Sequence, residues 1–379
     1  MDSSYSSESG DNRSYASCGN FSTIDDGDDT RDGTTFPPLY LALMWLNAFI
    51  TVSGNVITIV AFLSNTLIRN KPANILILNL ALADLKVGLV SLPFDILWWQ
   101  IGYWWMGEAV CKFWLIVDYT ASSQSMTAVL LITFDRLWMV SHIHSYVKHQ
   151  TRRKVLVAIL LSWTFWYLHF ILLATLWEPL SGVRDIDYSE DCDLAADGNL
   201  IYTLYETIGQ FVVPMILLAY ANVKIFTVIR KRAKTVKQVA GNDVIVAEEG
   251  STLARPIPMK QTHGGADRRG FDNDKRGHLE ADANQQEGSS SAATTRRSIQ
   301  KDRKAALTLS ILVGAFAVCW FPYNVVLIKE SVGTVRDGTL IFVDYLLWFN
   351  SALNPVLYVI TNSHFRTQLA KMFRCKVKL

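Results

Sequence analysis

VDYTASSQSMTAVLLITFDRLW, residues 117–138, is apolar enough to cross a membrane, yet it contains Asp118 near one end and Asp135 with Arg136 near the other. A charged side chain inside lipid is costly and generally marks a functional position. Asp118 and Arg136 are 18 residues apart. That spacing is about five turns of a helix, so both side chains should share one face, about 27 Å apart along the axis. One helix is therefore expected to join an anion near one side of the membrane to a cation near the other.

The composition of the whole chain favours a membrane protein. Of its 379 residues, 50% are hydrophobic, only 18% are charged and 12 are tryptophan, which is unusual for a water-soluble globule. A bilayer core about 30 Å thick requires about 20 apolar residues per helix. Seven stretches meet this requirement: residues 39–64, 74–99, 109–141, 154–177, 201–231, 304–328 and 339–361. We therefore expect an all-α fold, a seven-transmembrane helix bundle.

The positions of Lys and Arg indicate which ends of these spans face the cytoplasm, because cytoplasmic loops carry the positive excess. Basic residues gather between spans one and two, between three and four, after five and after seven. The opposite side is acidic, and in the loop between spans four and five Arg184 is outnumbered by five carboxylates. We expect a multi-pass protein of the plasma membrane with its N-terminus outside and its C-terminus inside.

The outer side has the features of an extracellular surface. Residues 1–38 are acidic and rich in Ser and Gly, and we expect a disordered tail that is glycosylated at the sequons of Asn12 and Asn20. Cys111 begins span three and Cys192 lies in the loop between spans four and five. Because the extracellular environment permits disulfides, we expect this pair to tie the loop to the helix.

The rest of the chain divides into two membrane blocks and two cytoplasmic segments. Residues 39–232 hold spans one to five, and residues 303–362 hold spans six and seven. Between them, 233–302 is polar and low in complexity, which is typical of a disordered third intracellular loop. Residues 363–379 combine apolar and basic side chains in the pattern of a short amphipathic helix on the inner membrane surface. Cys375, in that segment, is a candidate for palmitoylation.

Asp118 has no evident internal partner, because spans one, four and seven contain no interior Lys or Arg. An ion pair within the protein is the alternative, but a cation supplied from outside fits better. Aromatic faces attract ammonium groups by about 0.5 to 2 kcal/mol each. Four aromatic residues are expected nearby: Tyr119, Trp320, Tyr323 and Trp348. Each ring alone is more often a packing residue, but together with an unpaired Asp they favour a site for a cationic amine.

Further motifs follow along the chain in a fixed order. They are Ser53–Val56, Leu80–Asp84, Cys111, Asp135–Arg136, Trp163, Pro214, Cys319–Pro322 and Asn354–Tyr358. Over residues 39–375 this set resembles the rhodopsin class of G-protein-coupled receptors. Within that class, WLIVDYTAS (114–122), CWFPYN (319–324) and LLWFNSALNPVLY (346–358) resemble the biogenic-amine branch. Within that branch, the sequence resembles the muscarinic acetylcholine receptors and the third and fourth histamine receptors.

The resemblance implies a ligand site around Asp118. This carboxylate would be the counter-ion of the amine, and Tyr119, Trp320, Tyr323 and Trp348 would form an aromatic cage around it. The protein would thus be a cell-surface receptor for a small amine agonist, and not an enzyme.

The resemblance also implies a sodium site. Asp84, Ser125, Asn350 and Asn354 would line a small polar cavity, and Na⁺ bound there would disfavour the active state. A buried carboxylate such as Asp84 must in any case be protonated, hydrogen-bonded or ion-bound. No other cofactor and no other metal is expected.

At the cytoplasmic side, the resemblance implies a switch. Arg136 would be held at rest by Asp135 and Asp302 and then freed to meet a heterotrimeric G protein, with the inhibitory class favoured. Pro355 and Tyr358 would move with span six on activation. Arrestins, receptor kinases and membrane lipid are implied as further partners, and nucleic acid is not.

Three residues depart from the pattern of that class. Leu137 follows Arg136 where the class usually has Tyr, and Asn222 stands in span five where many relatives place a Tyr. Lys86 lies two residues beyond Asp84, which is about 200° round the helix. It should therefore point away from the polar cavity, and its partner is not evident from the sequence.

The identity of the amine depends on a second carboxylate. Glu206 and Gln210 lie one turn apart in the outer half of span five, where this branch binds the far end of its ligand. Glu206 could instead face lipid headgroups or pair with Lys329 or Arg336, as exposed charges often do. If it faces the ligand, histamine fits, with its ammonium on Asp118 and its imidazole on Glu206 or Gln210.

Acetylcholine is the competing ligand, because Ser122, Tyr323 and Asn324 resemble the muscarinic set. Glu206 argues against it, since a quaternary ester offers a buried carboxylate nothing to bind, and desolvation of that carboxylate would be costly. Another amine stays open. Catecholamines fit less well, because span five lacks the clustered serines that bind catechol hydroxyls.

Other functional classes have less support. A retinal-binding photoreceptor needs a Lys in span seven for its Schiff base, and residues 339–361 contain none. No repeat of polar or broken helices indicates a channel or a transporter. No nucleophile–base or metal-ligand spacing indicates an enzyme. A peptide receptor of the same fold stays open, although Asp118 and its aromatic set argue against it.

Overall fold

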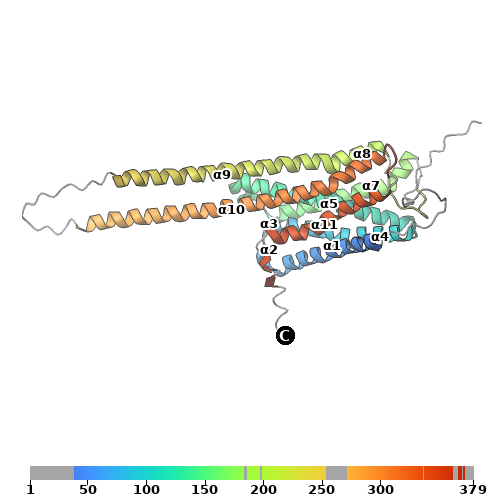
Figure 1. Ribbon diagram of the computed structural model, residues 1–379, viewed down its shortest axis with the longest axis horizontal. Helices are drawn as coiled ribbons and strands as arrows, with labels where there is room; N and C mark the ends of the chain where they lie inside the picture. The colour runs from blue at the N-terminus through green and yellow to red at the C-terminus, as the bar shows by residue number, and fades with distance from the viewer. Residues whose placement is uncertain are drawn as a thin grey trace, which may run out of the picture. The chain divides into compact units, whose positions relative to one another are not determined.

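The computed structural model describes residues 38–182, 186–196, 199–252, 271–335, 337–361, 366–368 and 370–371. Most of these residues are helical, and Figure 1 shows them as a set of long helices. In chain order the elements are α1 (Pro38–Ser64), α2 (Thr66–Arg69), α3 (Pro72–Lys86), η1 (Val87–Ser91), α4 (Leu92–Ile101), α5 (Gly107–Ser141), α6 (Ile143–His149), α7 (Arg152–Ser181), α8 (Leu200–Glu206), η2 (Thr207–Val212), α9 (Val213–Thr252), α10 (Phe271–Glu330) and α11 (Asp337–Thr361).

Seven helical segments in the described part are long and apolar enough to cross a membrane. They are Pro38–Ser64, Pro72–Ile101, Gly107–Ser141, Arg152–Ser181, Leu200–Val236, Asp302–Glu330 and Gly338–Leu357. Large apolar side chains remain exposed on them, such as Leu161 at 66% and Phe165 at 57% on α7. Such exposure suits a surface that faces lipid rather than water. The expected all-α fold with seven spans is confirmed.

The helices pack as two compact units. The first comprises Met1–Ile132, Thr151–Ile216 and Gly314–Leu379, and the second comprises Thr133–Gln150 and Leu217–Val313. Within the first unit, α1 packs against α3 and α11. Gly54 permits the close approach of α11, because a Cβ atom at this position would lie 2.9 Å from Cγ of Pro355. Any larger side chain would force the two helices apart.

Two of the spans contain a π-helical turn that the sequence did not predict. η1 is followed by Pro93 and η2 by Pro214, in each case two residues after the turn ends. Proline lacks an N–H group, and its ring clashes with the carbonyl four residues earlier, so an α-helix ahead of it is disturbed. A wider turn accommodates both effects and re-aims the side chains around it. Ser91 and Gln210 belong to these turns.

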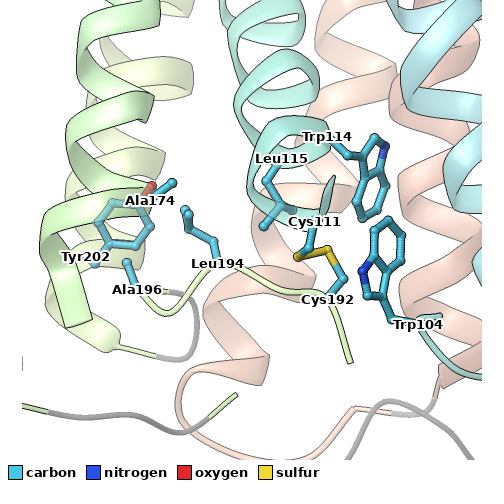
Figure 2. Packing of buried hydrophobic residues seen from close by; sticks show 9 residues of the cluster. All are labelled: Trp104, Cys111, Trp114, Leu115, Ala174, Cys192, Leu194, Ala196 and Tyr202. Atoms are coloured by element: carbon cyan, nitrogen blue, oxygen red, sulfur yellow. A yellow bond between two sulfur atoms is a disulfide. The ribbon is translucent and has the colours of Figure 1, made fainter. Parts of the chain in front are cut away.

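The predicted disulfide between Cys111 and Cys192 is confirmed, with Cα atoms 5.5 Å apart and a sequence separation of 81. Figure 2 shows the bridge beside Trp104 and Trp114, whose rings stack with centroids 5.5 Å apart. The same buried cluster contains Leu194, Ala196 and Tyr202. The bridge thus fixes the loop after α7 against α5, and this loop leads directly into α8.

The boundaries expected at 232 and 303 do not coincide with helix ends. α9 continues to Thr252, and α10 already begins at Phe271. Helical backbone therefore enters the segment 233–302, and the disorder of that segment stays a prediction.

Several predicted features lie outside the described residues. They are the sequons of Asn12 and Asn20, Cys375, and most of the amphipathic helix expected in 363–379. The backbone of Tyr358 belongs to α11, but the position of its side chain is not described.

Candidate functional site

Asp118 is the central charge of the first unit. It lies on α5 beside Ser91 of η1 and Trp348 of α11. Its Oδ1 atom is buried and has no hydrogen-bond partner, and no ion pair joins Asp118 to a basic side chain in the described part. Because a buried charge needs a partner, this arrangement suits a cation that arrives with a ligand. The alternative of an internal ion pair is not observed.

A chain of hydrogen bonds orients the second carboxylate. Oγ of Ser123 donates to Oε1 of Gln210 over 2.5 Å, and Nε2 of Gln210 donates to Oε1 of Glu206 over 2.9 Å. Glu206 is only 9% exposed, which argues against a side chain that faces headgroups, and no ion pair joins it to Lys329 among the described residues. Its Oε2 atom is buried without a hydrogen-bond partner. Gln210 thus holds one oxygen of Glu206, and the Tyr202 side chain also acts on this carboxylate.

The local structure explains why Glu206 and Gln210 stay together. Asn199 caps α8, its Oδ1 accepting from the backbone N–H groups of Ile201 and Tyr202. Tyr202 is buried in the disulfide cluster, which anchors the first turn of α8. Glu206 is the last residue of α8 and Gln210 lies within η2.

The predicted aromatic residues fall into two groups. Trp348 is 7% exposed and packs edge-on against Tyr345 at 5.4 Å, while its Nε1 atom is buried without a partner. Trp320 is 6% exposed and stacks on Phe316 at 4.9 Å. Tyr119 instead packs against Phe170 of α7 at 5.3 Å. The aromatic cage around Asp118 stays a prediction.

The polar residues expected from the muscarinic pattern lie on α5 and α10. Asn324 is buried, and its Nδ2 atom donates to the carbonyl of Trp320 within α10 over 2.9 Å. Ser122 and Tyr323 are partly buried. The serine that hydrogen-bonds to Gln210 is Ser123, which was not predicted from the sequence.

Asp84 is the centre of a second polar cluster and is fully buried. Its Oδ1 accepts from Oγ of Ser125 at 3.1 Å and from Oγ of Ser351 at 2.9 Å, and its Oδ2 accepts from Nδ2 of Asn354 at 2.8 Å. Three of the four predicted residues therefore meet, and Ser351 takes the place expected for Asn350. The Oδ1 atoms of Asn350 and Asn354 are buried without partners. A single carboxylate with such amide oxygens fits a monovalent cation.

Lys86 finds its partners on α7. Its Nζ atom donates to the hydroxyl of Tyr167 and lies 4.1 Å from the ring centroid of Trp163. As expected, it takes no part in the contacts of Asp84. Cation–π contact and a hydroxyl acceptor thus satisfy a charge within a span.

Asp135 and Arg136 belong to the second unit. Both oxygens of Asp135 accept from the hydroxyl of Tyr146 at 3.2 Å, and Oδ1 also accepts from Nε2 of Gln150 at 2.6 Å. Burial and the neighbouring Asp135 charge raise the pKa of Tyr146 to about 12, so its hydroxyl stays a donor at neutral pH. These contacts from α6 and the residue after it were not predicted from the sequence.

Arg136 is close to the predicted acidic partner without pairing with it. Arg136 and Asp302 line one small pocket, together with Ile225 and Leu309. The Nη1 atom of Arg136 approaches Sδ of Met139 at 3.7 Å. No ion pair joins Arg136 to Asp135 or Asp302 among the described residues, and so a resting-state lock stays a prediction.

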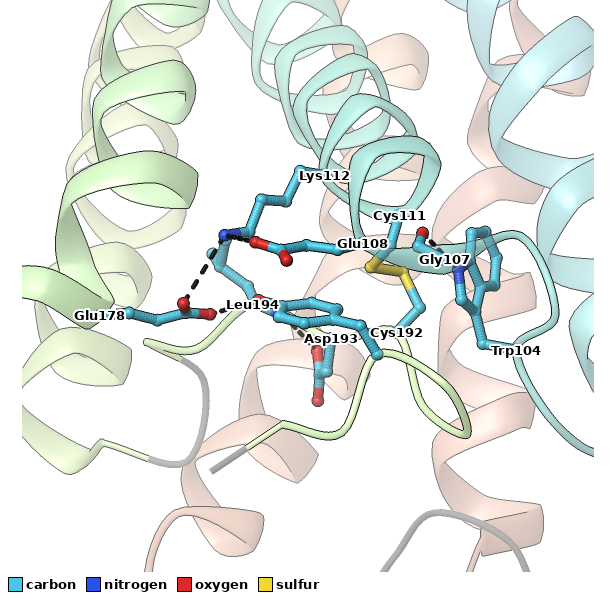
Figure 3. Close-up of a disulfide and its surroundings, with 10 residues drawn as sticks. Trp104, Gly107, Glu108, Cys111, Lys112, Glu178, Cys192, Asp193 and Leu194 are labelled. Atoms are coloured by element: carbon cyan, nitrogen blue, oxygen red, sulfur yellow. Dashed lines mark hydrogen bonds and ion pairs between the residues drawn. A yellow bond between two sulfur atoms is a disulfide. The ribbon is translucent and has the colours of Figure 1, made fainter. Parts of the chain in front are cut away.

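A charged network covers the disulfide. Nζ of Lys112 lies 2.7 Å from Oε1 of Glu108 and 3.6 Å from Oε2 of Glu178 (Figure 3). The Tyr188 hydroxyl donates to Glu178, and its ring lies 5.1 Å from the Lys112 ammonium. Burial, followed by the bond to Glu178, raises the pKa of Tyr188. The network ties α5, α7 and the loop together beside the disulfide, which joins α5 to the loop.

Comparison with known proteins places this geometry in a family. Residues 54–358 match the family described as 7 transmembrane receptor (rhodopsin family). The probable G-protein coupled receptor No18 of Amphibalanus amphitrite is 26% identical over 345 residues, which cover 88% of this chain and 89% of the relative. The 5-hydroxytryptamine receptor 1B of Homo sapiens is 28% identical over 360 residues, covering 89% and 87%. The receptor of that name from Felis catus is 28% identical over 335 residues, covering 83% and 82%. Since the family match extends over well more than half of the chain, the protein belongs to the rhodopsin family of seven-transmembrane receptors.

Proposed function

We propose that this receptor responds to a cationic biogenic amine at the cell surface and that histamine is the amine its charges fit best. The observation that carries the proposal is the Asp118 carboxylate, whose buried Oδ1 atom lacks a partner in a span. An ammonium group would supply the missing charge. The basic cytoplasmic loops and the acidic outer loop support an extracellular N-terminus. With that orientation, Asn12 and Asn20 would be glycosylated outside and Cys375 would be palmitoylated inside.

Glu206 supports histamine over acetylcholine. Its Oε2 atom has no partner, whereas Gln210 fixes its Oε1 atom. An imidazole N–H or an imidazolium can donate to that open oxygen, while the ammonium of the same molecule binds Asp118. Acetylcholine has no donor for it.

Relatives that are named receptors for 5-hydroxytryptamine make that amine the second candidate. It also carries an ammonium group and N–H and O–H donors. At 28% identity the relatives support the amine branch rather than one amine.

The proposal is tested by dose–response curves for cyclic AMP and calcium in transfected cells. Histamine, acetylcholine and 5-hydroxytryptamine are applied side by side, with untransfected cells as the control. We expect histamine to act at the lowest concentration, and a fall in cyclic AMP would indicate the inhibitory G-protein class. If none of the three acts through the receptor, or if acetylcholine alone does, the proposed ligand is wrong.

Glu206→Gln is expected to weaken histamine by about tenfold to a hundredfold, because a hydrogen bond to a charged group contributes about 1.5 to 3 kcal/mol. Phenethylamine, which has an ammonium group but no polar group at its far end, should lose much less. The measurement is the ratio of half-maximal concentrations for the two ligands. Equal losses would contradict a role of Glu206 in binding the far end. Thr203→Val, one turn earlier on α8, is the control for the helix itself.

We further propose that the Asp84 cluster binds Na⁺ and that the bound ion holds the receptor at rest, with Asp84, Ser125, Asn350 and Asn354 around it and Ser351 as an added member. The orphan amide oxygens and the single carboxylate support this proposal. When bound, the ion would supply the positive charge that Asp84 otherwise lacks. Arg136, Asp302, Pro355 and Tyr358 would then respond at the G-protein side.

Asp84→Asn is expected to abolish the effect of NaCl on agonist affinity, because the neutral amide no longer attracts a cation. The measurement is agonist affinity in NaCl and in N-methylglucamine chloride at equal ionic strength. The wild-type receptor should bind agonist more weakly in NaCl, and the variant should bind equally in both. A variant that keeps the sodium effect would exclude this site.

A further inference from the structure

Lys86 is a basic residue in the middle of a membrane span, and neither the amine site nor the sodium site uses it. It is the fifteenth of the 30 residues of the span Pro72–Ile101. At 1.5 Å per residue, it lies about 21 Å from either end of that span. A lysine side chain reaches the membrane surface only from a position near a helix end. The ammonium group of Lys86 therefore stays within the apolar part of the bilayer.

Lys86 lies on a side of α3 that is exposed rather than packed in the bundle. Leu82, one turn earlier, is 42% exposed, and Leu89, three residues later, is 55% exposed. Lys86 itself is partly exposed. Because these residues belong to a membrane span, their exposed surface faces lipid. The ammonium group is thus accessible from the hydrocarbon of the bilayer.

Neutral groups hold this ammonium in the described part of the chain. The hydroxyl of Tyr167 accepts from Nζ, which lies 4.1 Å from the ring centroid of Trp163 and 4.9 Å from that of Tyr167. These groups orient the ammonium but carry no negative charge. No ion pair joins Lys86 to a described carboxylate, and two of its three N–H donors have no acceptor among the described residues. Since a charge in an apolar environment is costly without a counter-charge, the unused donors indicate an anion from outside the described chain.

The aromatic surface beside Lys86 is fixed in place. The rings of Trp163 and Tyr167 stack with centroids 5.8 Å apart. Nε1 of Trp163 donates to Oδ1 of Asn79 over 2.8 Å, and the same oxygen accepts from Nε2 of Gln124 at 3.3 Å. These bonds join α3, α5 and α7. The ammonium group is therefore held in one position between α3 and α7, and a preorganised donor binds an acceptor at a lower entropic cost.

The depth of Lys86 selects among the possible anions. The phosphate of a phospholipid is anchored among the headgroups, about 15 Å from the centre of a bilayer core about 30 Å thick. A second copy of this chain is also a poor source, because its carboxylate at a similar depth, Asp84, is fully buried. A single-chain carboxylic acid can reach this depth, because its protonated form is uncharged and crosses the apolar core.

We propose that Lys86, Trp163 and Tyr167 form a lipid-facing site for a free fatty acid. The carboxylate of the acid accepts from the two unused N–H donors of Lys86, and its hydrocarbon chain lies along Leu82 and Leu89. The acid supplies the negative charge that the described residues around Lys86 lack. This site is separate from the amine site and does not depend on which amine the receptor binds.

The test measures displacement of a photoreactive fatty acid from the purified full-length receptor in phosphatidylcholine nanodiscs. The probe is hexadecanoic acid with a diazirine beside its carboxyl group, and mass spectrometry identifies the labelled peptides. The competitors are unlabelled hexadecanoic acid and hexadecanol, the matching alcohol. The variants are Lys86→Met, Lys86→Arg and Tyr167→Phe. Lys71→Met is the control, because Lys71 is exposed at the start of the same span.

The acid should displace the probe at a concentration at least about tenfold lower than the alcohol, because a hydrogen bond to a charged group is stronger than one between neutral groups. The probe should label residues 82–89 and 163–167. Lys86→Met should remove the preference for the acid, and it should not lower the melting temperature, because it removes a charge from an apolar span. Lys86→Arg and Tyr167→Phe keep the positive charge and should keep the preference, as should Lys71→Met.

Four results overturn the inference. They are equal displacement by acid and alcohol, wild-type labelling confined to other segments, a preference that survives in Lys86→Met, and a preference that Lys71→Met removes, which would place the acid at the membrane surface. Nanodiscs that contain phosphatidylglycerol distinguish the source of the anion. If this lipid prevents labelling in the wild-type receptor, a phospholipid headgroup occupies the site and the fatty acid is excluded. No amine enters these measurements, so failure of the proposed function would leave their outcome unchanged.

Discussion

Asp118→Asn is expected to abolish the response to amine agonists, while the receptor still reaches the cell surface. The buried Oδ1 atom of Asp118 lacks a partner, so the ammonium of the ligand would provide its only counter-charge among the described residues. Removing one member of a buried charge pair costs about 2 to 5 kcal/mol. That corresponds to a loss of roughly 30-fold to several thousand-fold in affinity.

The measurement combines agonist dose–response curves with surface labelling of the same cells. Asn has the shape of Asp and retains a carbonyl oxygen, so loss of the ligand response without loss of surface protein isolates the charge. Glu190→Gln removes one negative charge from the exposed outer loop and should leave the response unchanged. An Asp118→Asn receptor that keeps wild-type potency would show that the amine, if any, binds elsewhere.

Charge in an apolar segment made Asp118 and Asp84 predictable from the sequence alone. A span has few ways to satisfy a carboxylate, so each one stands out against its neighbours. Length and hydropathy likewise indicated seven spans. The distribution of Lys and Arg indicated that Cys111 and Cys192 both lie on the extracellular side. That placement predicted the disulfide, which the structure contains.

The contacts of individual polar side chains were not predictable in the same way. Successive residues on a helix are about 100° apart, so a small local rotation decides whether Ser122 or Ser123 faces Gln210. The π-helical turns introduce such rotations, and hydropathy carries no sign of them, although Pro93 and Pro214 mark their positions. Similarly, Ser351 rather than Asn350 bonds to Asp84.

Long-range partners from short helices were also missed. Tyr146 and Gln150 hold Asp135, but they lie 11 and 15 residues away in the chain, beyond the end of the span. Their approach depends on how α6 folds back after α5, and no periodicity in the sequence encodes that turn. For this reason, the sequence suggested that Asp135 pairs with Arg136. In the structure, Tyr146 and Gln150 hydrogen-bond to Asp135 instead.

Replacing both Cys111 and Cys192 by Ser is expected to lower the melting temperature sharply and to remove most ligand binding. In the chain-entropy description, a disulfide that closes a loop of this length lowers the entropy of the unfolded chain and thereby stabilises the folded state by about 4 kcal/mol. The bridge is also the centre of the buried cluster that holds Trp104 against Trp114 and includes Leu194 (Figure 2). Without it, the loop after α7 keeps its packing, the Lys112 network and the hydrogen bond from the backbone N–H of Trp104 to the carbonyl of Glu190.

The consequence for ligand binding follows from the path of the chain. The loop that contains Cys192 continues into α8, whose Tyr202 packs in the same cluster one turn before Glu206. Releasing the loop should therefore loosen the carboxylate that we assign to the far end of histamine.

Thermal unfolding and agonist binding are measured before and after treatment with dithiothreitol, which should convert the wild-type receptor to the behaviour of the double variant. Cys319→Ser is the control, because Cys319 is buried and free, and its loss should change neither property much. A double variant that retains wild-type stability would show that the disulfide is not needed to hold the loop. Ligand binding that survives despite lower stability would show that the loop does not determine the position of Glu206.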